Sequence, residues 1–361
     1  MKKGLYLDLE RIKDLINIES GAYAPLKGFL RQRDFLSVLS DMRLADGNVW
    51  PVPIVLDIDK ETAEKISSME EVSLLDEKGD QVGLLKSPEV FSYSKRDLAE
   101  KVFGTDDLSH PGVAGVFSME EFLLGGEVKI TKKVQHTLEN YFSHPERTKD
   151  FFKKNNWKKV VAFQTRNIPH RGHEFLQKEA LRQADGLLIQ PVVGKKKQGD
   201  FLDEVILGSY KVLIEKFFPD KKALLSALPL EMRYAGPREA VFHALIRRNY
   251  GCTHFIIGRD HAGVGDFYSP FAAQEIFDNF DYQEIGVEIL KFSEVVFDYK
   301  TGEHCFIDES EEKSRINFSG TKLREFLVKK EEPPEYMLRP EIYQFLINHK
   351  KIFVENEEEN L

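Results

Sequence analysis

Apolar and polar positions alternate over short distances in the first 150 residues of the chain. Such runs cover residues 49–56, 71–75 and 81–85, and glycine, aspartate and proline separate them. Short alternating runs bounded by turn-forming residues are typical of β-strands. We therefore predict a β-rich domain with a few helices over residues 1–150, in which the polar and aromatic stretch 140–156 leads into the next domain.

The pattern changes at Lys158, where strand-like runs begin to alternate with helical stripes. Residues 159–163 and 186–193 are apolar and rich in strand-forming residues, and between them residues 171–184 repeat apolar side chains at helical spacing. A strand, a helix and a second strand in this order predict a βαβ unit.

The alternation continues further along the chain. Residues 237–249 form a helical stripe that begins at Pro237, a residue that suits a first helical turn. The next predicted elements are a buried strand at 253–257, a helix at 269–280 and a strand at 286–292. Because strands that alternate with helices are typical of parallel sheets, we predict a Rossmann-like, doubly wound α/β domain over residues 151–300.

The last part of the chain carries short helical patterns. Residues 321–330 and 340–349 are predicted helices on either side of Pro333 and Pro334. We predict a small α-rich C-terminal domain over residues 301–361.

The composition is that of a soluble globular protein. Hydrophobic residues make up 42% of the chain and charged residues 31%, which excludes a disordered or fibrous class. A chain of 361 residues exceeds what one core normally holds, in agreement with the two or three domains predicted above. The net charge of −9 argues against a nucleic acid as the main partner.

The chain shows no sign of export or of membrane insertion. Acidic residues follow Lys2 and Lys3 before any long apolar run, unlike a signal peptide, and no apolar window reaches the length of a membrane span. Cys252 and Cys305 are too few for a disulfide framework or a four-thiolate zinc site. We therefore predict a cytoplasmic protein without a membrane partner.

The strongest candidate for a functional site is the segment 164–174. It follows the first strand of the α/β domain, and open α/β sheets bind ligands at that end of their strands. His170 and His173 lie three residues apart at the predicted start of a helix, where free backbone N–H groups and the helix dipole favour phosphate. Gly172 leaves room for a nucleotide to approach the backbone. The alternative is that the two histidines only cap or pack the loop, but a glutamine, an asparagine, two arginines and two histidines within this stretch favour a site.

A second polar loop follows the strand at 253–257. Arg259, Asp260 and His261 should face the same crevice as the first segment, because the two strands are predicted neighbours. Asp260 could also be a simple cap. A metal site made of Asp260, His261 and Asp266 is a further alternative, but a catalytic zinc site normally takes three protein ligands that converge.

Two weaker candidates stay open between a structural and a functional interpretation. Ser319, Gly320 and Thr321 precede Leu323 and Arg324, so they either cap a helix or bring N–H groups and the arginine to phosphates. The basic run 195–197 follows the second strand and is either a solvated surface or a group of phosphate ligands.

Four segments carry a family resemblance. Residues 164–174, QTRNIPHRGHE, resemble the Q-T-R-N-x-x-H-R-x-H-E signature of ATP sulfurylases (sulfate adenylyltransferases), and their HRGH core resembles the HxGH motif of the nucleotidylyltransferase superfamily. Residues 257–263 are similar to the family's G-R-D-H-A-G loop, residues 318–324 to its I-S-G-T-x-L-R segment, and residues 21–30 to its G-A-F-x-P-L-x-G-F-M segment. The resemblance runs in the expected order over nearly the whole chain.

The chain departs from the family pattern at a few positions. Ile168 stands between Asn167 and Pro169, whereas many members have proline directly after the asparagine, and Gly172 replaces a frequent alanine. The cysteine-rich zinc site of some bacterial relatives has no counterpart here, so no protein-bound zinc is expected. Because there is no G-x-x-x-x-G-K-[ST] loop, a fused adenylyl-sulfate kinase is not expected either.

The resemblance implies a fold and a reaction. The fold would combine a PUA-like N-terminal domain, a Rossmann-like nucleotidylyltransferase domain and a small C-terminal domain. The reaction would be the reversible conversion of ATP and sulfate to adenylyl sulfate and pyrophosphate, by in-line attack of sulfate on the α-phosphate without a covalent enzyme intermediate. Mg²⁺ would accompany ATP or pyrophosphate, and the protein would form a homo-oligomer, a dimer or larger.

The resemblance also implies residue roles. The sulfate would be bound by Gln164, Arg166 and the Ala262 backbone N–H. The catalytic group would comprise Thr165, Arg166, Asn167, His170 and His173, in which Thr165 and Asn167 hold α- and β-phosphate oxygens and the histidines stabilise the transition state and the leaving pyrophosphate. The ATP site would combine Gln164 and these five residues with an adenosine pocket formed by Gly258, Arg259, Asp260, His261 and Val296.

Two rival functions remain. One is an HxGH-type adenylyltransferase with another acceptor, such as a phosphopantetheine or nicotinamide mononucleotide, although such proteins are usually smaller and lack the QTRN and GRDHAG segments. The other is a non-catalytic nucleotide-binding relative, against which the intact polar residues of every motif argue.

Overall fold

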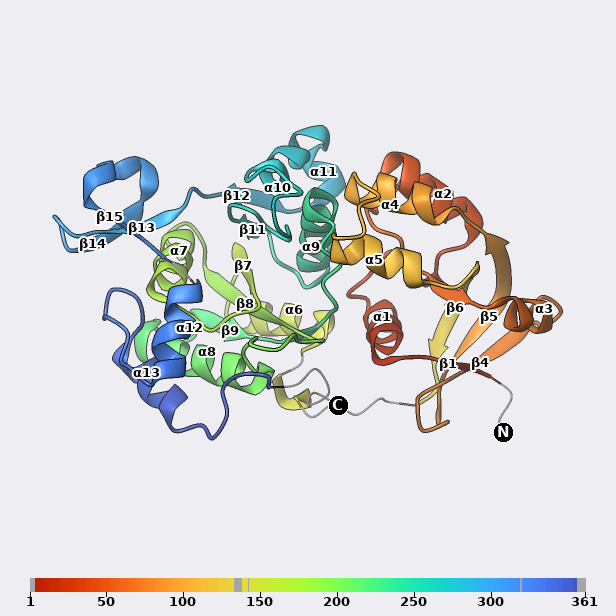
Figure 1. Ribbon diagram of the computed structural model, residues 1–361, viewed down its shortest axis with the longest axis horizontal. Coiled ribbons are helices and arrows are strands. Elements are labelled where there is room, and N and C mark those ends of the chain that lie inside the picture. The colour runs from red at the N-terminus through yellow and green to blue at the C-terminus, as the bar shows by residue number, and fades with distance from the viewer. Residues whose placement is uncertain (1–3, 133–137, 142, 319, 356–361) are drawn as a thin grey trace.

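The computed structural model describes residues 4–132, 138–141, 143–318 and 320–355. The chain forms an N-terminal sheet, a central parallel sheet flanked by helices and a small third sheet near the C-terminus. Figure 1 shows the N-terminal part at one end of the molecule, the central sheet in the middle and the small sheet at the other end. Within the described residues no helix has the length and apolar character needed to cross a membrane.

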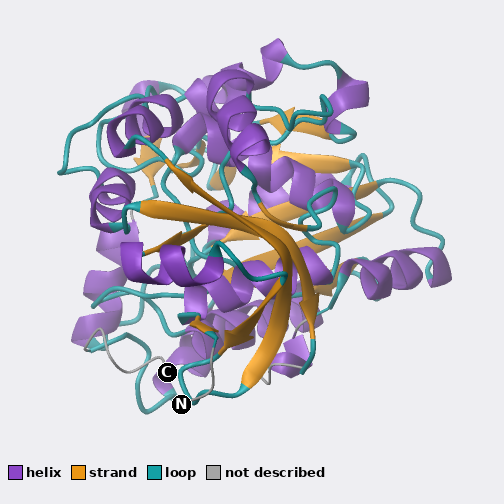
Figure 2. Cartoon of the chain, turned by 90° about the vertical axis from the view of Figure 1, so that its right-hand side faces the viewer, coloured by secondary structure: helices purple, strands orange, loops and turns teal. Residues whose placement is uncertain are grey.

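The N-terminal sheet is mostly antiparallel and has six strands. Its order is β1 (Leu5–Tyr6), β4 (Glu71–Leu75), β5 (Gln81–Ser92), β6 (Phe122–Ile130) and β2 (Gly28–Phe29), and β3 (Leu56–Ile58) also pairs with β6. The helices of this part are α1 (Leu9–Glu19), α2 (Gln32–Asp41), α3 (Lys60–Ile66), α4 (Lys95–Phe103) and α5 (Pro111–Ser118). The long curved strands of this sheet face the viewer in Figure 2.

The predicted strands of this part have different outcomes. The strand at 71–75 is confirmed, and the strand at 81–85 continues to Ser92. The strand predicted at 49–56 is wrong, because residues 50–55 lie outside any strand and β3 begins only at Leu56. Pro51 and Pro53 lack the N–H donors that a sheet ladder needs. The alternating apolar positions therefore correspond to buried side chains here, although the backbone forms no strand.

The central sheet is parallel and doubly wound, as predicted. Its order is β10 (Leu228–Pro229), β8 (Gly186–Val193), β7 (Val160–Thr165), β11 (His254–Ile257) and β12 (Glu288–Lys291), and β9 (Ala223–Leu225) also pairs with β8. After β7 the chain adds strands on one side, then returns to add β11 and β12 on the other. The strand order thus reverses between β7 and β11, and open α/β sheets bind ligands at such a switch point.

Helices cover both faces of this sheet. They are α6 (Pro145–Lys154), α7 (Arg171–Leu181), α8 (Asp203–Phe217), α9 (Gly236–Asn249), α10 (Ala272–Glu275) and α11 (Tyr282–Ile285), with short 3₁₀ turns at Glu139–Tyr141 and Ile276–Asn279. The helices expected at 171–184 and 237–249 are confirmed within three residues, whereas the one expected at 269–280 begins at Ala272 and continues as a 3₁₀ turn. Helix α8 was not predicted, and α6 occupies the stretch expected to join two domains.

The C-terminal part contains the two predicted helices and a sheet that was not predicted. The helices are α12 (Gly320–Lys329) and α13 (Pro340–Ile347). The antiparallel sheet consists of β14 (Glu303–Phe306), β13 (Val295–Asp298) and β15 (Arg315–Asn317), with 3₁₀ turns at Ile307–Glu309 and Glu312–Ser314. The hairpin of β13 and β14 spans residue 300, and the domain limits at 150 and 300 stay predictions.

Two hydrophobic clusters lie on the two faces of the central sheet. One runs without a break from the N-terminal sheet to α9, and includes Tyr23, Trp50 and Phe242, whose rings are 5.1 to 6.0 Å apart. The other joins the opposite face to α8, α12 and α13 through residues such as Tyr210 and Leu323. The N-terminal part thus packs behind one side of the switch point and the C-terminal helices behind the other.

Candidate active site

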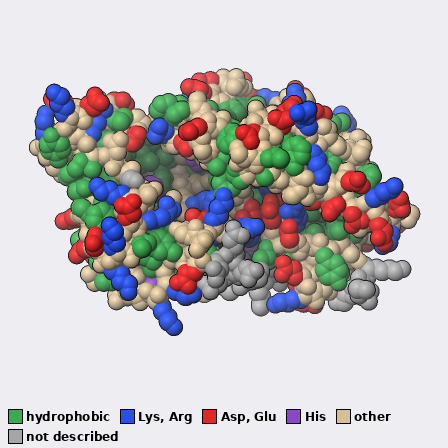
Figure 3. All heavy atoms as spheres, viewed as in Figure 1, with side chains coloured by type: hydrophobic (Ala, Val, Ile, Leu, Met, Phe, Trp, Pro, Cys, Tyr) green, Lys and Arg blue, Asp and Glu red, His purple; other side chains and the backbone are tan. Residues whose placement is uncertain are grey.

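The two polar loops predicted from sequence meet at the switch point. The first leaves the end of β7 and the second leaves the end of β11, and these strands pair at Val161 and His254. A space-filling view of the same orientation as Figure 1 shows a hollow in this region, with histidine on its floor and lysine and arginine side chains along its rim (Figure 3).

Gln164 and His261, one from each loop, are joined by a third residue, His243 of α9. Gln164 Nε2 and His261 Nε2 each lie 3.0 Å from His243 Nδ1. Because an amide nitrogen can only donate, Nδ1 accepts and the hydrogen of the ring stands on Nε2, which faces Glu239 Oε1 at 3.4 Å. Both His243 and Glu239 are completely buried, and burial lowers the pKa of His243, so this ring is neutral. The side-chain oxygen of Gln164, Oε1, has no hydrogen-bond partner among the described residues.

Arg166 is held on the opposite side of the first loop. Its NH1 donates to the Tyr234 hydroxyl at 3.0 Å, its NH2 reaches the Lys195 carbonyl at 3.5 Å, and Asp200 lies 3.7 Å away. The Arg166 guanidinium also lies over the Tyr234 ring, as does the Lys197 ammonium. The arginine is therefore fixed mainly by a neutral tyrosine, which leaves much of its charge for an anion.

Thr165 and Asn167 shape the turn after β7. The Thr165 hydroxyl donates to the Asn167 carbonyl and accepts from the Asn167 N–H, at 3.2 and 3.1 Å. The Asn167 side-chain oxygen accepts from Arg324 NH2 at 3.1 Å. The arginine of the FSGTKLR segment thus lies at the first loop, whereas Ser319 falls outside the described residues.

His170 and His173 stack on one another at the start of α7, with ring centroids 3.6 Å apart. His170 caps the helix, since its Nδ1 accepts from the His173 N–H at 3.2 Å, so the capping interpretation is correct for this residue. On its other face His170 stacks on Phe318 at 5.2 Å. Burial lowers the pKa of His170 well below its usual value, and that of His173 to about 4. Both rings are therefore neutral near pH 7, and His170 can donate only through Nε2.

The space over Gly172 is smaller than the sequence suggested. A Cβ atom at this position would come within 3.0 Å of the Phe318 ring and of His170 Cε1. The glycine thus admits Phe318 rather than leaving an open approach for a nucleotide. The FSGTKLR segment closes the site over the histidines.

Arg171 and Glu174 turn away from the crevice. Glu174 is buried and pairs with Arg339 through two contacts of 2.8 and 2.9 Å, and the Arg171 N–H donates to the Met337 carbonyl. Two charged residues of the first motif therefore attach α7 to the segment before α13.

The second loop has a strained backbone. Asp260 and Ala262 have φ angles of 54° and 59°, a region that residues other than glycine rarely adopt. Gly258 directly follows β11. Arg259 is exposed and lies 3.8 Å from Glu294, and both Arg259 and Asp260 line a hollow of about 380 Å³ formed by residues 259–270. The loop that was expected to bind adenosine thus borders a cavity.

Val296 is completely buried in β13, between its partners Cys305 and Asn317. No contact found in the described part of the chain joins it to the hollow at 259–270, and its place in an adenosine pocket stays a prediction.

The basic run 195–197 divides into three environments. The Lys195 N–H donates to Glu231, Lys196 is buried and pairs with Asp203 at 2.8 Å, and Lys197 lies over the Tyr234 ring. Lys197 thus adds positive charge beside Tyr234, the residue that holds Arg166. Lys196 is structural.

The alternative of a metal site is not supported. Across residues 4–132, 138–141, 143–318 and 320–355 no group of three or more His, Cys, Asp or Glu side chains is placed to hold a metal ion. Asp260, His261 and Asp266 therefore do not form such a group.

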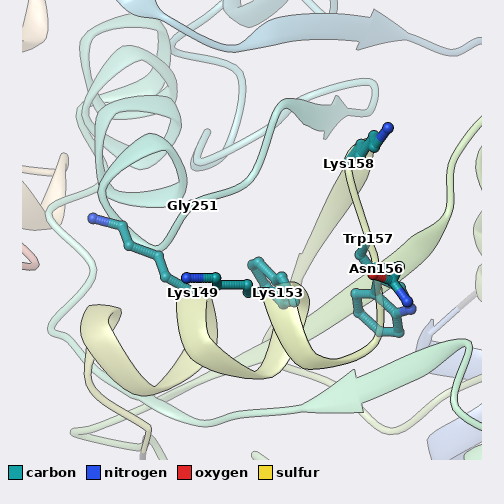
Figure 4. A pocket seen from close by; sticks show the side chains of 7 residues that line it. Lys149, Lys153, Asn156, Trp157, Lys158 and Gly251 are labelled. Atoms are coloured by element: carbon teal, nitrogen blue, oxygen red, sulfur yellow. The ribbon is translucent and has the colours of Figure 1, made fainter.

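A second hollow of about 380 Å³ lies at the other end of the parallel strands. It is lined by Lys149, Lys153 and Trp157, and by Lys158, which precedes β7. The Lys158 side chain points away from the other two lysines, so the charges do not converge on one ligand (Figure 4). This hollow lies away from the polar loops.

Tyr234, Glu239 and His243 were missed by sequence reasoning. Glu239 and His243 lie in the predicted helical stripe at 237–249, where they were not considered as site residues, and Tyr234 lies before that stripe. A signal was present for the glutamate and the histidine, since they stand four residues apart on either side of the apolar residues 240–242 and such side chains meet on one helix face.

The chain is similar to known proteins over nearly its whole length. The family model described as ATP-sulfurylase matches residues 139–349, and the model of a PUA-like domain matches residues 2–133. Sulfate adenylyltransferase of Pyrococcus abyssi is 45% identical over 97% of this chain and 91% of its own length. The same enzyme of Thermococcus onnurineus is also 45% identical, with the same shares, and that of Halothermothrix orenii is 41% identical over 95% and 91%.

A solved structure also resembles the fold. The structure described as hexameric APS kinase from Thiobacillus denitrificans has a TM-score of 0.74 and 24% identity to this chain. The match covers 96% of this chain but 63% of that longer chain, so the two share a fold over this part only.

Proposed function

The chain belongs to the ATP-sulfurylase family, and on this premise we propose that it is a sulfate adenylyltransferase that converts ATP and sulfate to adenylyl sulfate and pyrophosphate, reversibly. The observation that carries the proposal is the meeting of Gln164, Arg166 and the loop of Ala262 at the switch point of the central sheet. These groups include an arginine and amide donors, which suit a small oxyanion.

The sulfate would be bound between the two loops. Arg166 offers a planar guanidinium that matches a tetrahedral oxyanion, and Tyr234 holds it without neutralising its charge. Gln164 has one amide hydrogen left after its contact with His243, and the Ala262 N–H would complete the site. Such a cradle would hold sulfate against the repulsion of the approaching phosphates.

The phosphates would lie toward the start of α7. Asn167 and Thr165 would contact α- and β-phosphate oxygens, and the neutral rings of His170 and His173 would donate hydrogen bonds to the charge that builds on the leaving pyrophosphate. The dipole of α7 favours the same charge, although the Arg171 and His173 N–H groups already donate to Met337 and His170. A sulfate oxygen would attack the α-phosphorus in line, so no side-chain nucleophile is needed.

Adenosine would occupy the hollow beside the second loop, next to Gly258, Arg259, Asp260 and His261, with Val296 behind it. Mg²⁺ would arrive with ATP or pyrophosphate, whose phosphate oxygens are ligands that this ion prefers. We further propose that the protein is cytoplasmic and that it forms a homo-oligomer. Light scattering on the purified protein would test the oligomeric state.

The test is formation of ATP from adenylyl sulfate and pyrophosphate by the purified protein. The parent should be active, and Arg166→Ala and His173→Ala should each lose at least about 100-fold in rate because each removes a donor aimed at developing charge. Arg182→Ala is the matched control, because its exposed side chain contacts only Glu179 on the far part of α7. A parent without activity, or an Arg166→Ala variant as active as the control, contradicts the proposal.

A further inference from the structure

Residues 231–243, which we call the positioning segment, contact every group proposed to bind sulfate. The Tyr234 hydroxyl accepts from Arg166 at 3.0 Å, and His243 Nδ1 accepts from Gln164 at 3.0 Å. The Gly236 N–H donates to the Ala262 carbonyl at 3.1 Å. All three residues proposed to bind sulfate are therefore contacted from one stretch of chain.

From these contacts we infer that the positioning segment sets the affinity of the enzyme for sulfate, with Tyr234 and His243 as positioning residues. The inference rests on the proposed function, because it concerns the residues assigned to sulfate there. Tyr234 and His243 do not need to touch the substrate. They fix the direction of the donors that do, and prior orientation reduces the entropy lost on binding.

The positioning segment is itself held rigidly. Glu239 accepts from the N–H groups of Arg233 and Ala235 at 2.9 and 3.0 Å, which closes the turn before α9. The Tyr234 carbonyl accepts from His110 Nε2 and from the Tyr268 hydroxyl, at 3.1 and 3.0 Å. A carboxylate and two side chains from distant parts of the sequence thus fix this turn.

The backbone conformation of the turn shows the same constraint. Tyr234 and Gly236 have φ angles of 59° and 48°, and a Cβ atom on Gly236 would come within 2.7 Å of the Tyr268 ring. Positive φ at a tyrosine costs free energy, and such strain is kept where the surroundings impose it. Here it aims the Tyr234 hydroxyl at Arg166.

His243 connects the turn to both loops through its tautomer. Its Nε2–H faces Glu239, which leaves the one lone pair of Nδ1 to accept from the Gln164 amide, with His261 Nε2 also 3.0 Å away. A residue that only filled space at this position would not need an acceptor at Nδ1. Substitutions that keep one ring nitrogen's function and remove the other can therefore separate the two roles.

The first experiment compares Tyr234→Phe with the parent. The variant keeps the ring but loses the hydroxyl that accepts from Arg166, so the KM for sulfate should rise roughly tenfold, as expected for a lost hydrogen bond to a charged group. The KM for ATP should stay within about twofold, since no adenosine or phosphate group contacts Tyr234 in the proposal. Steady-state kinetics in the direction of adenylyl sulfate synthesis measure both values.

The second experiment uses the pair His243→Asn and His243→Gln. Asparagine places its oxygen where Nδ1 stands and keeps the acceptor, whereas glutamine places its amide nitrogen near Nε2 and keeps only the contact with Glu239. The KM for sulfate should therefore rise roughly tenfold in His243→Gln and clearly less in His243→Asn.

Arg248→Ala serves as the control at the other end of α9, outside the positioning segment. Arg248 donates to the Glu284 carbonyl at 3.3 Å and to the Asn249 side-chain oxygen at 3.4 Å, so its loss should lower the melting temperature and leave the KM for sulfate unchanged. If the parent makes no ATP from adenylyl sulfate, the proposed function itself is wrong. If the parent is active and Tyr234→Phe and His243→Gln keep its KM for sulfate, or raise the KM for ATP equally, the positioning role alone is overturned.

Discussion

The two halves of the site are supported by different parts of the chain. What we call the sulfate half, the part around Arg166 that is proposed to bind sulfate, contacts the turn before α9, and that turn contacts the N-terminal part through Arg233 and His110. What we call the pyrophosphate half, the part around His170 that is proposed to bind phosphates, is covered by the C-terminal segment through Phe318 and Arg324. The first support lies in a continuous hydrophobic core, whereas Phe318 is only partly buried. We infer that the residues supporting the sulfate half belong to the rigid core of the protein, whereas those supporting the pyrophosphate half lie nearer its surface.

The largest expected effect comes from separating the N-terminal part from the sulfate half. Arg233 NH2 donates to Asp14 at 2.7 Å, and both side chains are largely buried. Asp14→Ala leaves Arg233 without its close partner, so we expect the free energy of unfolding to fall by about 3 kcal/mol and the KM for sulfate to rise. Urea unfolding and steady-state kinetics measure the two effects.

The matched control for this prediction is Glu61→Ala on α3. Glu61 pairs with Lys65 on an exposed helix face, and such pairs contribute little to stability. Equal loss of stability in Asp14→Ala and Glu61→Ala, or a sulfate KM that stays at the parent value in Asp14→Ala, would show that the N-terminal part does not support the sulfate half.

An intermediate effect is expected from the other side of the comparison. Arg324→Ala removes the contact that orients Asn167, so the KM for ATP or the KM for pyrophosphate should rise roughly tenfold while the KM for sulfate stays near the parent value. Lys329→Ala, an exposed residue on the same helix, is the control. A selective rise in the KM for sulfate in Arg324→Ala would contradict the division of the site into two halves.

The sequence predicted the central sheet better than its surroundings. The limits of β8 follow from a run between Asp185 and Gly194 that is apolar except for Gln190, because a strand buried on both faces leaves such a run. Helix α8 is apolar around most of its surface and contains Gly208, so its periodicity is weak. The structure explains this glycine, since a Cβ atom there would come within 2.2 Å of Phe345 on α13.

The site divides in the same way. Gln164, Arg166, His170 and His173 could be found because their polar side chains crowd a strand end in one short segment. Tyr234 could not be found in this way, and His243 offered only its spacing from Glu239, because the importance of both lies in contacts with residues 68 and 79 positions away along the chain. Motifs therefore indicated the groups that are proposed to contact substrate, and only the fold revealed what holds them.

The smallest expected effect is a dependence of stability on pH that arises from His170 and His173 in the pyrophosphate half. Burial lowers the pKa of His170 and His173, so the folded protein binds fewer protons than the unfolded chain between about 6.5 and the folded values, of which that of His173 is about 4. Their contribution to stability is therefore complete above about pH 6.5 and is lost as the pH falls toward about 4. Replacing Phe318 with alanine exposes the His170 ring, so stability should fall less steeply with pH. Between about pH 6.5 and about pH 4 the melting temperature of Phe318→Ala should therefore drop by a few degrees less than that of the parent.

Melting curves of the parent, Phe318→Ala and His173→Gln across this range test the prediction, because the carboxylates that also titrate there are common to all three. Parallel curves for the three proteins would mean that the stacked histidines titrate as freely as exposed ones, and that the C-terminal segment does not shield this half of the site.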